Sequence, residues 1–264
     1  MILPYSYFYF VSALPPELCD AIIEHGLEKM SNAKKEFGEE SIIATTGDWK
    51  HKQADLSKST TSVEDKTLEE VMSDGTTVDD IYVRDSDVSW ITERWIYEAI
   101  WPFIHKANKD AGWNFDWDFT EDMQFTKYGV GQFYGWHADA GPHPYEIFDP
   151  AIHEYAKNED GSLILSATGD PIPEQGHFTD VPEMVGKIRK LSVTVSLSDP
   201  SDYDGGDLKF DLGPHAPKRF HTCEEIRPRG SIIVFPSHIH HQVTPVTRGT
   251  RYSLVAWNLG RPFR

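Results

Sequence analysis

The sequence predicts a mainly β fold of the α+β class, a barrel or jelly roll that helices near the N-terminus support. Apolar residues recur at helical spacing before residue 120, whereas alternation with a period of two dominates after it. The helices precede the strands without a strand–helix–strand rhythm, which argues against a doubly wound parallel sheet. We therefore expect one domain over 1–264, with helical support in 1–119 and the β core in 120–264.

Two helices are expected in the N-terminal part. Pro15 and Pro16 suit the start of the first helix, because a proline in the first turn loses no needed hydrogen bond. Gly26, or a residue slightly beyond it, suits its end. An apolar stripe over 91–104 predicts the second helix, which Pro102 should kink or split because its ring clashes with the preceding turn.

The β core is predicted from short alternating segments separated by glycine and proline turns. In 190–198, apolar residues alternate with serine and threonine, which is typical of a half-buried strand. The segment 140–187 is too long for a simple connection and indicates a lid or a binding loop. The candidate strands are 122–128, 132–139, 190–198, 206–211, 230–236 and 251–259.

Composition excludes several classes of protein. The 25 basic and 42 acidic residues give a net charge of −17, so we expect no nucleic-acid partner. Two cysteines far apart in the sequence support no disulfide framework and suit a reducing compartment. We find no signal peptide and no apolar run long enough to span a membrane, so we expect a cytoplasmic protein without membrane contact.

One histidine–acid triplet stands out among the 12 histidines. In a strand, residues two apart point to the same face, so His137 and Asp139 can reach one metal ion. Taken alone, they could equally be a surface pair on an edge strand. A second histidine would complete a facial triad of two histidines and one carboxylate, which leaves metal positions open. The cluster 236–243 offers His238, His240 and His241.

An arginine, two tyrosines and a tryptophan elsewhere in the β core could line a pocket for a small ligand beside that metal. Arg251 follows His241 by ten residues and could grip a carboxylate in a bidentate fork, although it could also form an ordinary ion pair. Tyr128 could offer its hydroxyl to the same ligand or pack in the core. Tyr134 and Trp136 could be barrel packing or walls of a substrate pocket.

Taken together, these residues resemble the prolyl 4-hydroxylase-like iron(II)/2-oxoglutarate dioxygenases. The resemblance covers most of 120–260 in several ordered blocks, and 18–26 and 83–90 resemble the helical support of that family less specifically. The blocks are Tyr128-x-x-Gly131-x-x-Tyr134-x-x-His137-x-Asp139, Tyr203-x-Gly205-Gly206-x-Leu208-x-Phe210, Gly230-Ser231-x-x-Val234-Phe235-Pro236-Ser237, His241-x-Val243-x-Pro245-Val246, and Gly249-x-Arg251-Tyr252-Ser253-Leu254 with Trp257.

The resemblance implies a double-stranded β-helix, the jelly-roll relative typical of this family. His137, Asp139 and His241 match the iron ligands of the family, which leaves His238 and His240 outside the metal site. Arg251 matches the residue that pairs with the distal carboxylate of 2-oxoglutarate, and Tyr128 matches an aromatic hydroxyl used against the same carboxylate.

The resemblance also implies a reaction. Iron(II), 2-oxoglutarate and O2, with ascorbate as reductant, would hydroxylate a C–H bond and release succinate and carbon dioxide. Asp139 favours hydroxylation over halogenation, because a halogenase of this type leaves that position to halide. We expect a prolyl residue of a peptide or protein, hydroxylated at C4, as the substrate. The insertions 140–187 and 212–228 should lie near the mouth of the site and bear on the choice of substrate.

Two alternatives remain open. The same chemistry could act on a free amino acid or another small molecule. The chain could instead be a metal-binding jelly-roll protein without catalysis, but such a protein needs no carboxylate clamp at Arg251.

Overall fold

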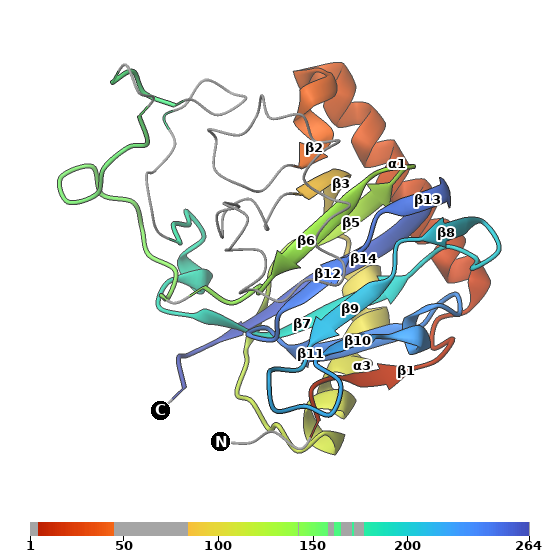
Figure 1. The fold of residues 1–264 in the computed structure, drawn as a ribbon. Helices are drawn as coiled ribbons and strands as arrows, with labels where there is room; N and C mark the ends of the chain where they lie inside the picture. Colours follow the sequence, from red (N-terminus) through yellow and green to blue (C-terminus); the bar gives the residue numbers. More distant parts are fainter. Residues whose placement is uncertain are drawn as a thin grey trace, which may run out of the picture.

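The computed structural model describes residues 5–44, 84–141, 143–157, 161–164, 171 and 177–263. The expected fold class is confirmed: the strands form a curled antiparallel sheet, and two helices pack on one of its faces (Figure 1). No described helix is long and apolar enough to cross a membrane.

Among the described residues, the helices are α1 (Pro16–Phe37) and α3 (Arg94–Asp110), with 3-10 turns at Glu39–Ile42, Pro182–Met184 and Glu224–Ile226. The strands are β1 (Phe8–Phe10), β2 (Ile43–Ala44), β3 (Arg84–Ile91), β4 (Phe119–Thr120), β5 (Met123–Tyr128), β6 (Phe133–His137), β7 (Ile188–Ser196), β8 (Tyr203–Gly205), β9 (Leu208–Asp211), β10 (Phe220–Thr222), β11 (Ile232–Pro236), β12 (His241–Val243), β13 (Val246–Gly249) and β14 (Arg251–Gly260).

The main sheet has the order β1-β11-β7-β14-β5-β3-β6-β12-β9-β10, and every pairing in it is antiparallel. The sheet turns at β3, whose residues 87–91 pair with β5 while residues 84–85 pair with β6. The curl returns β9 to β11, where the rings of Phe210 and Phe235 lie 5.1 Å apart. This curl encloses a pocket between the two halves of the sheet.

Alternation along the central strands separates a core face from a pocket face. In β7, Leu191, Val193 and Val195 join the core cluster with the helices. Their neighbours are small polar residues, and Thr194 lines the pocket. Burial of one such aliphatic side chain contributes about 1.5–3 kcal/mol to stability. The apolar residues of β7 therefore pack against the helices, and its polar residues are left to face the pocket.

The first helix is longer than the sequence predicted. It continues through Gly26 and ends at Gly38, whose φ of 91° suits glycine and whose N–H donates to the Lys34 carbonyl. Gly26 is instead a point of close approach: a Cβ there would lie 2.3 Å from the ring of Phe125 on β5. The glycine therefore lets the helix touch the sheet.

The second helix also departs from expectation. It begins at Arg94 rather than at Ile91, which is the last residue of β3, and it runs through Pro102 as one helix. The expected helical support in 1–119, including the block 83–90, is corrected in part. The described residues there also form β1, β2 and β3, which pair within the main sheet. Ile91 faces the core from the end of a strand. An apolar residue at this position fits a strand as well as a helix, so the apolar pattern did not separate the two.

The predicted strands correspond to β5, β6, β7, β9, β11 and β14. The strand predicted over 132–139 is shorter, because β6 ends at His137 and Asp139 lies beyond it. In the insertion 212–228, β10 adds an edge strand to β9. In the described part of 140–187, aromatic rings gather around Phe148, which lies 4.6 Å from Tyr155 and 5.1 Å from Phe178 between ring centroids.

Candidate metal centre

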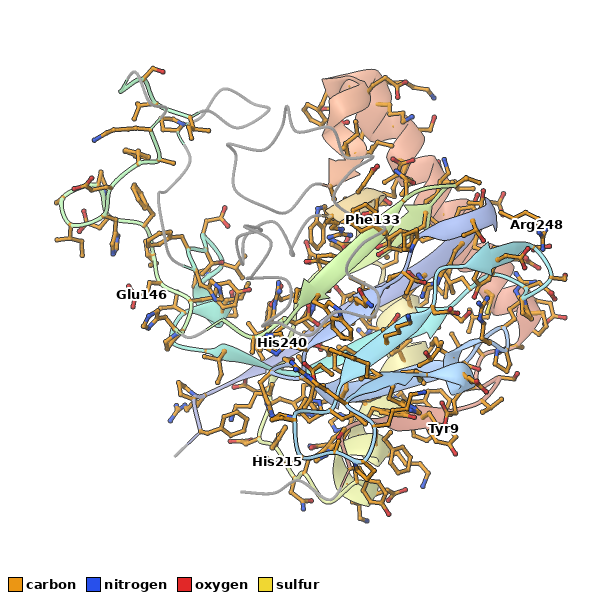
Figure 2. The ribbon with its side chains drawn as sticks, viewed as in Figure 1. Tyr9, Phe133, Glu146, His215, His240 and Arg248 are labelled. Carbon is orange, nitrogen blue, oxygen red and sulfur yellow. The ribbon has the colours of Figure 1, made fainter. Side chains whose placement is uncertain are left out.

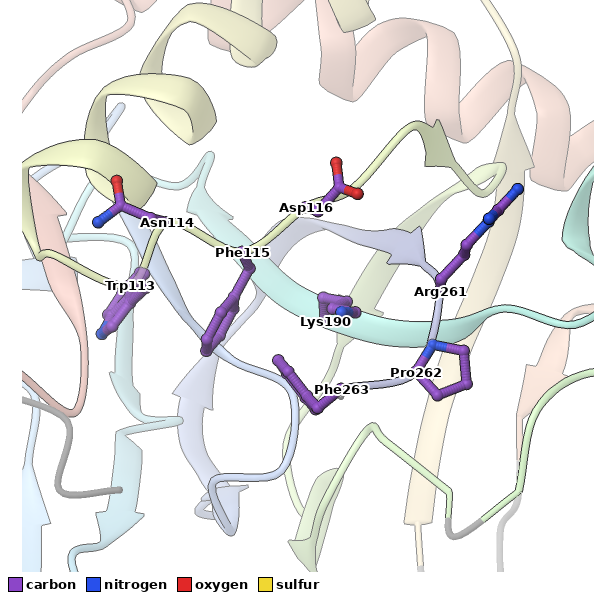
Figure 3. A pocket seen from close by; sticks show the side chains of 8 residues that line it. All are labelled: Trp113, Asn114, Phe115, Asp116, Lys190, Arg261, Pro262 and Phe263. Carbon is purple, nitrogen blue, oxygen red and sulfur yellow. The ribbon is translucent and has the colours of Figure 1, made fainter.

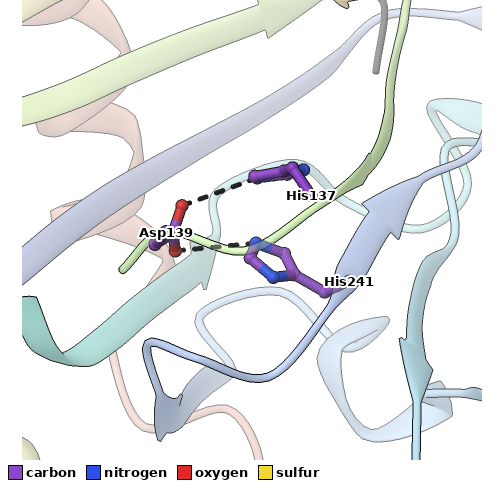
Figure 4. Close-up of side chains that lie close together, drawn as sticks. All are labelled: His137, Asp139 and His241. Carbon is purple, nitrogen blue, oxygen red and sulfur yellow. Dashed lines mark ion pairs between the residues drawn. The ribbon is translucent and has the colours of Figure 1, made fainter. Parts of the chain in front are cut away.

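The fold brings together His137, Asp139 and His241 (Figure 4). His137 ends β6 and His241 begins β12, and the two residues are direct cross-strand partners. Side chains in such pairs lie about 5 Å apart. The chain leaves β6 after His137 and places Asp139 against both rings. One ligand atom from each residue lies within 4.8 Å of the others, which suits a single metal ion.

Asp139 and His241 are held in the protonation states that a metal requires. Asp139 Oδ1 lies 3.5 Å from His137 Nε2, and its Oδ2 lies 3.6 Å from His241 Nε2. Burial opposes the charge on Asp139, but the neighbouring histidines hold the pKa of this carboxyl well below its usual range. Burial and the adjacent His137 lower the pKa of His241 to about 4. A carboxylate therefore faces a neutral imidazole.

The second ring nitrogen of each histidine faces a backbone carbonyl. His137 Nδ1 lies 2.8 Å from the Gly135 oxygen, and His241 Nδ1 lies 3.0 Å from the Ile239 oxygen. When each Nδ1 carries the proton and donates it there, each Nε2 presents a lone pair toward Asp139. Asp139 Oδ2 is buried without a hydrogen-bond partner among the described residues. The donor set thus fits iron(II) or another divalent transition metal.

The other two histidines of the cluster point elsewhere. His238 and His240 are exposed and lie outside the three-residue group, and Figure 2 labels His240. Only His241 continues into β12 with a partner on β6. Among the three candidates of 236–243, the geometry therefore selects His241.

Arg251 and Tyr128 lie side by side on the pocket floor. They are cross-strand partners of β14 and β5, and the Arg251 guanidinium carbon lies 5.4 Å from the Tyr128 ring centroid. Arg251 is 2% exposed and donates to Ser253 Oγ over 3.1 Å. No carboxylate among the described residues forms an ion pair with it, so the ordinary ion pair considered for Arg251 is not what the structure shows.

The two aromatic residues before His137 take different roles. The Tyr134 ring stacks on the His137 ring with 3.6 Å between centroids and lines the pocket. Trp136 points to the other side of β6 and packs on Phe220 of β10, 5.2 Å between centroids. Tyr134 is therefore a pocket wall, whereas Trp136 connects the insertion 212–228 to the strand that carries His137.

Sequence reasoning missed two groups around the site. Arg84 and Gln124 line the pocket from β3 and β5, and finding Arg84 required β3 to be predicted as a strand. Arg189 of β7 forms a bidentate ion pair with Glu121, with Nε–Oε1 and Nη2–Oε2 distances of 2.6 and 2.5 Å. Its Nη1 also donates to the Asp139 carbonyl over 3.4 Å. Strict alternation along 190–198 would place Arg189 on the core face with Leu191, so it gave no signal for this residue. The β14 pairing shifts register between Asn258 and Leu259, opposite Leu191 and Arg189, and such a shift cannot be seen in the sequence of β7 alone.

The described histidines of the long insertion differ in their exposure to solvent. His143 is exposed, whereas His153 and His177 are half-buried. The ring of His177 occupies the space that a Cβ on Gly141 would fill, 1.6 Å from such an atom. The insertion therefore packs directly beside the loop that carries Asp139.

A second pocket of about 430 Å³ lies on the other side of β7 (Figure 3). Lys190 lines it and follows Arg189, so the two side chains leave opposite faces of the strand. Phe115 and Phe263 provide apolar walls, and Lys190 Nζ lies 4.0 Å from the Phe263 ring centroid. This pocket shares no lining residue with the metal centre.

The fold and the site define a class: a curled antiparallel sheet that holds two histidines and one carboxylate beside a buried arginine. Residues 123–258 match the family model of the 2OG-Fe(II) oxygenase superfamily. The chain belongs to this superfamily. Membership implies iron(II) and 2-oxoglutarate as cofactor and cosubstrate, in agreement with the donor set.

Known proteins resemble the chain in part of its sequence and in its fold. A PKHD-type hydroxylase of Sphingopyxis alaskensis is 39% identical over 108 residues, which are 41% of this chain and 42% of the relative. The match thus spans less than half the length of that relative. The fold resembles a viral collagen prolyl hydroxylase of Paramecium bursaria Chlorella virus 1, solved with 2-oxoglutarate (TM-score 0.51, 15% identity, 97% of both chains). It also resembles a Pseudomonas putida prolyl-4-hydroxylase (TM-score 0.51, 17% identity, 96% and 92% of the two chains).

Proposed function

We propose that this protein is an iron(II)- and 2-oxoglutarate-dependent dioxygenase that hydroxylates a prolyl residue of a peptide or protein. The observation that carries the proposal is the triad of His137, Asp139 and His241 beside the buried, carboxylate-free Arg251. A metal site alone would need only the triad. The added arginine fits a cosubstrate with a free carboxylate.

The residues of the chain divide the work by position. His137 and His241 would offer Nε2 and Asp139 a carboxylate oxygen to the iron, which supplies the oxidation of a C–H bond coupled to decarboxylation of 2-oxoglutarate when bound. Arg251 and Ser253 would hold the distal carboxylate of 2-oxoglutarate through charge-assisted hydrogen bonds. Buried Tyr128 would close the same end of the pocket and exclude water.

The substrate side of the pocket is supported by shape and by resemblance. Tyr134 forms a flat aromatic wall beside His137, which suits a proline ring. The insertions 140–187 and 212–228 meet the loop and the strand that carry the metal ligands, and such loops commonly cover a bound chain. The blocks around His137 and His241 resemble those of prolyl 4-hydroxylases, which supports proline over other residues.

The experiment combines cosubstrate turnover with product mass. The protein is incubated with iron(II), ascorbate, 2-oxoglutarate and proline-rich peptides, and succinate and the gain of one oxygen atom are measured. His241→Ala should abolish both signals and binding of Mn(II), used as a surrogate for iron. His240→Ala is the matched control, since this exposed neighbour should leave them unchanged. Oxidation of free amino acids in place of peptides would move the assignment to a small-molecule substrate, and metal binding without succinate would indicate a non-catalytic protein.

A further inference from the structure

A second buried arginine faces the catalytic pocket from β3. Arg84 is 5% exposed and lines the pocket together with the metal ligands. Its Nε donates to Ser86 Oγ over 2.8 Å, and its Nη2 donates to Gln124 Oε1 over 2.6 Å. A guanidinium has five N–H donors in a planar fork, so three of them remain after these two hydrogen bonds.

Arg84 has no acidic partner within the described part of the chain, whereas most other arginines there have one. Across the described residues, the arginines at 94, 189, 219, 227, 229 and 248 each form an ion pair with an aspartate or glutamate. Arg84 and Arg251 are the buried arginines of the described chain, and neither forms such a pair. An uncompensated buried charge is costly. Two such charges in one pocket indicate two anionic groups to be bound.

The two arginines occupy different ends of the pocket. Arg251 is paired in register with Tyr128, at the end of β5. Arg84 is paired in register with Tyr134, and its guanidinium carbon lies 4.6 Å from the centroid of that ring. The Tyr134 ring also stacks on the ring of His137, 3.6 Å away between centroids. Arg84 is therefore separated from the metal ligands by one aromatic ring.

We infer that Arg84 binds a carboxylate of the substrate, next to the residue that is oxidised. The inference rests on the proposed function, which assigns Arg251 to 2-oxoglutarate and leaves Arg84 for a second carboxylate. The N–H groups of Arg84 that have no hydrogen-bond partner in the described ranges suit bidentate binding. Two sources have this chemistry: the C-terminal carboxylate of a chain that ends at the oxidised residue, and an aspartate or glutamate side chain beside it.

The test compares matched carboxylates and carboxamides by calorimetry. The protein is loaded with Mn(II) and 2-oxoglutarate, and the probes are N-acetylglycyl-proline and its C-terminal amide. A second pair, N-acetylglycyl-prolyl-aspartyl-amide and its asparaginyl counterpart, distinguishes a side chain from a chain end. In the unaltered protein, at least one carboxylate should bind about ten- to a hundredfold more tightly than its amide.

Two variants and a control test the residue. Arg84→Met should reduce the ratio of carboxylate to amide affinity to about one, and Arg84→Lys, which keeps the charge without the fork, should give an intermediate ratio. Both should bind Mn(II) and 2-oxoglutarate as the unaltered protein does. Arg248→Met is the control, because Arg248 is exposed on β13 and pairs with Asp204 (Figure 2). Thermal unfolding confirms that each variant is folded.

Three results would overturn the inference: equal binding of both members of both pairs, an unchanged ratio in Arg84→Met, or a loss of Mn(II) or 2-oxoglutarate binding in that variant. The last would assign Arg84 to the metal or the cosubstrate instead. These results are distinct from a failure of the proposed function, which would show as no succinate from 2-oxoglutarate with any probe. The binding ratio is measured in either case.

Discussion

At the scale of single residues, the site depends on short-range relations that fix each side chain. His137 and His241 face each other across two strands, and a carbonyl two residues earlier in the chain faces the Nδ1 of each. Asp139 needs only two more residues after His137 to reach both rings. The atoms that could bind a metal are thus positioned by the backbone of β6 and β12, so we expect conservative replacements elsewhere to leave them in place.

Arg251 gives the first prediction at this scale. Arg251→Ala should weaken 2-oxoglutarate binding by about ten- to a hundredfold, because a charge-assisted hydrogen-bonded pair contributes about 1.5–3 kcal/mol. Mn(II) binding should change little, since Arg251 contacts no metal ligand. Titration of the Mn(II)-loaded protein with 2-oxoglutarate measures the first quantity and electron paramagnetic resonance the second. An unchanged affinity for 2-oxoglutarate would remove the cosubstrate role of Arg251.

The sequence predicted the residues of the site better than their surroundings. His137 and Asp139 could be found because a period-two strand places alternate residues on one face, and the resemblance then selected His241. Arg84 could not be found, because its role depends on β3 pairing with both β5 and β6 far along the chain. The alternation of side chains within one strand can be read from neighbouring residues. The pairing of one strand with both halves of a sheet depends on residues far apart in the sequence.

At the scale of elements, one glycine sets the distance between α1 and the sheet. Gly26→Ala should destabilise the protein although alanine favours helix by up to ~1 kcal/mol. The new Cβ would meet the fully buried Phe125 ring at 2.3 Å, and overpacking of this kind costs about 1–3 kcal/mol. Urea unfolding of Gly26→Ala measures the loss. Phe125→Leu in the same background should recover part of it, and a stabilised Gly26→Ala variant would contradict the close approach.

A charged contact joins the same helix to the start of α3. Glu93 Oε1 lies 2.8 Å from Lys29 Nζ, and its Oε2 lies 2.9 Å from His25 Nε2. Burial opposes the charge, but the hydrogen bonds from Lys29 and His25 lower the pKa of Glu93 to about 2 from its ordinary value of 4.5. Because the folded state has the lower pKa, this contact stabilises the protein fully above about pH 4.5 and is lost as the pH falls toward 2.

Glu93→Gln tests this contact between helices. The variant should be less stable than the unaltered protein by about 1 kcal/mol at pH 7, and the difference should disappear as the pH falls from 4.5 to 2. Denaturant unfolding at a series of pH values measures it. Glu98→Gln is the control, because Glu98 pairs with Arg94 in an exposed contact within α3. A difference that persists unchanged at pH 2 would show that packing rather than charge joins the two helices.

At the scale of the whole molecule, the curled sheet and the long insertion meet at the metal centre. Glu121, which precedes β5, is bound by Arg189 of β7 and accepts a hydrogen bond from the Tyr145 hydroxyl over 3.2 Å. The same Arg189 reaches the Asp139 carbonyl and stacks over Trp257, 4.1 Å from the ring centroid. This ion pair, in which Glu121 is buried and Arg189 half-buried, thus connects the sheet, the insertion and the loop of Asp139.

Glu121→Gln should loosen the insertion and the metal centre together. The variant leaves the half-buried Arg189 without its carboxylate, and the loss of such a charge-assisted pair costs about 1.5–3 kcal/mol. Hydrogen exchange should quicken at Tyr145 and Gly186, whose N–H groups donate to the Lys187 and Tyr145 carbonyls, and Mn(II) affinity should fall with it. Tyr145→Phe is the matched variant: it removes only the hydroxyl, so exchange should quicken while Mn(II) binding is kept. If Glu121→Gln left exchange at Tyr145 unchanged, the ion pair would not be what holds the insertion to the site.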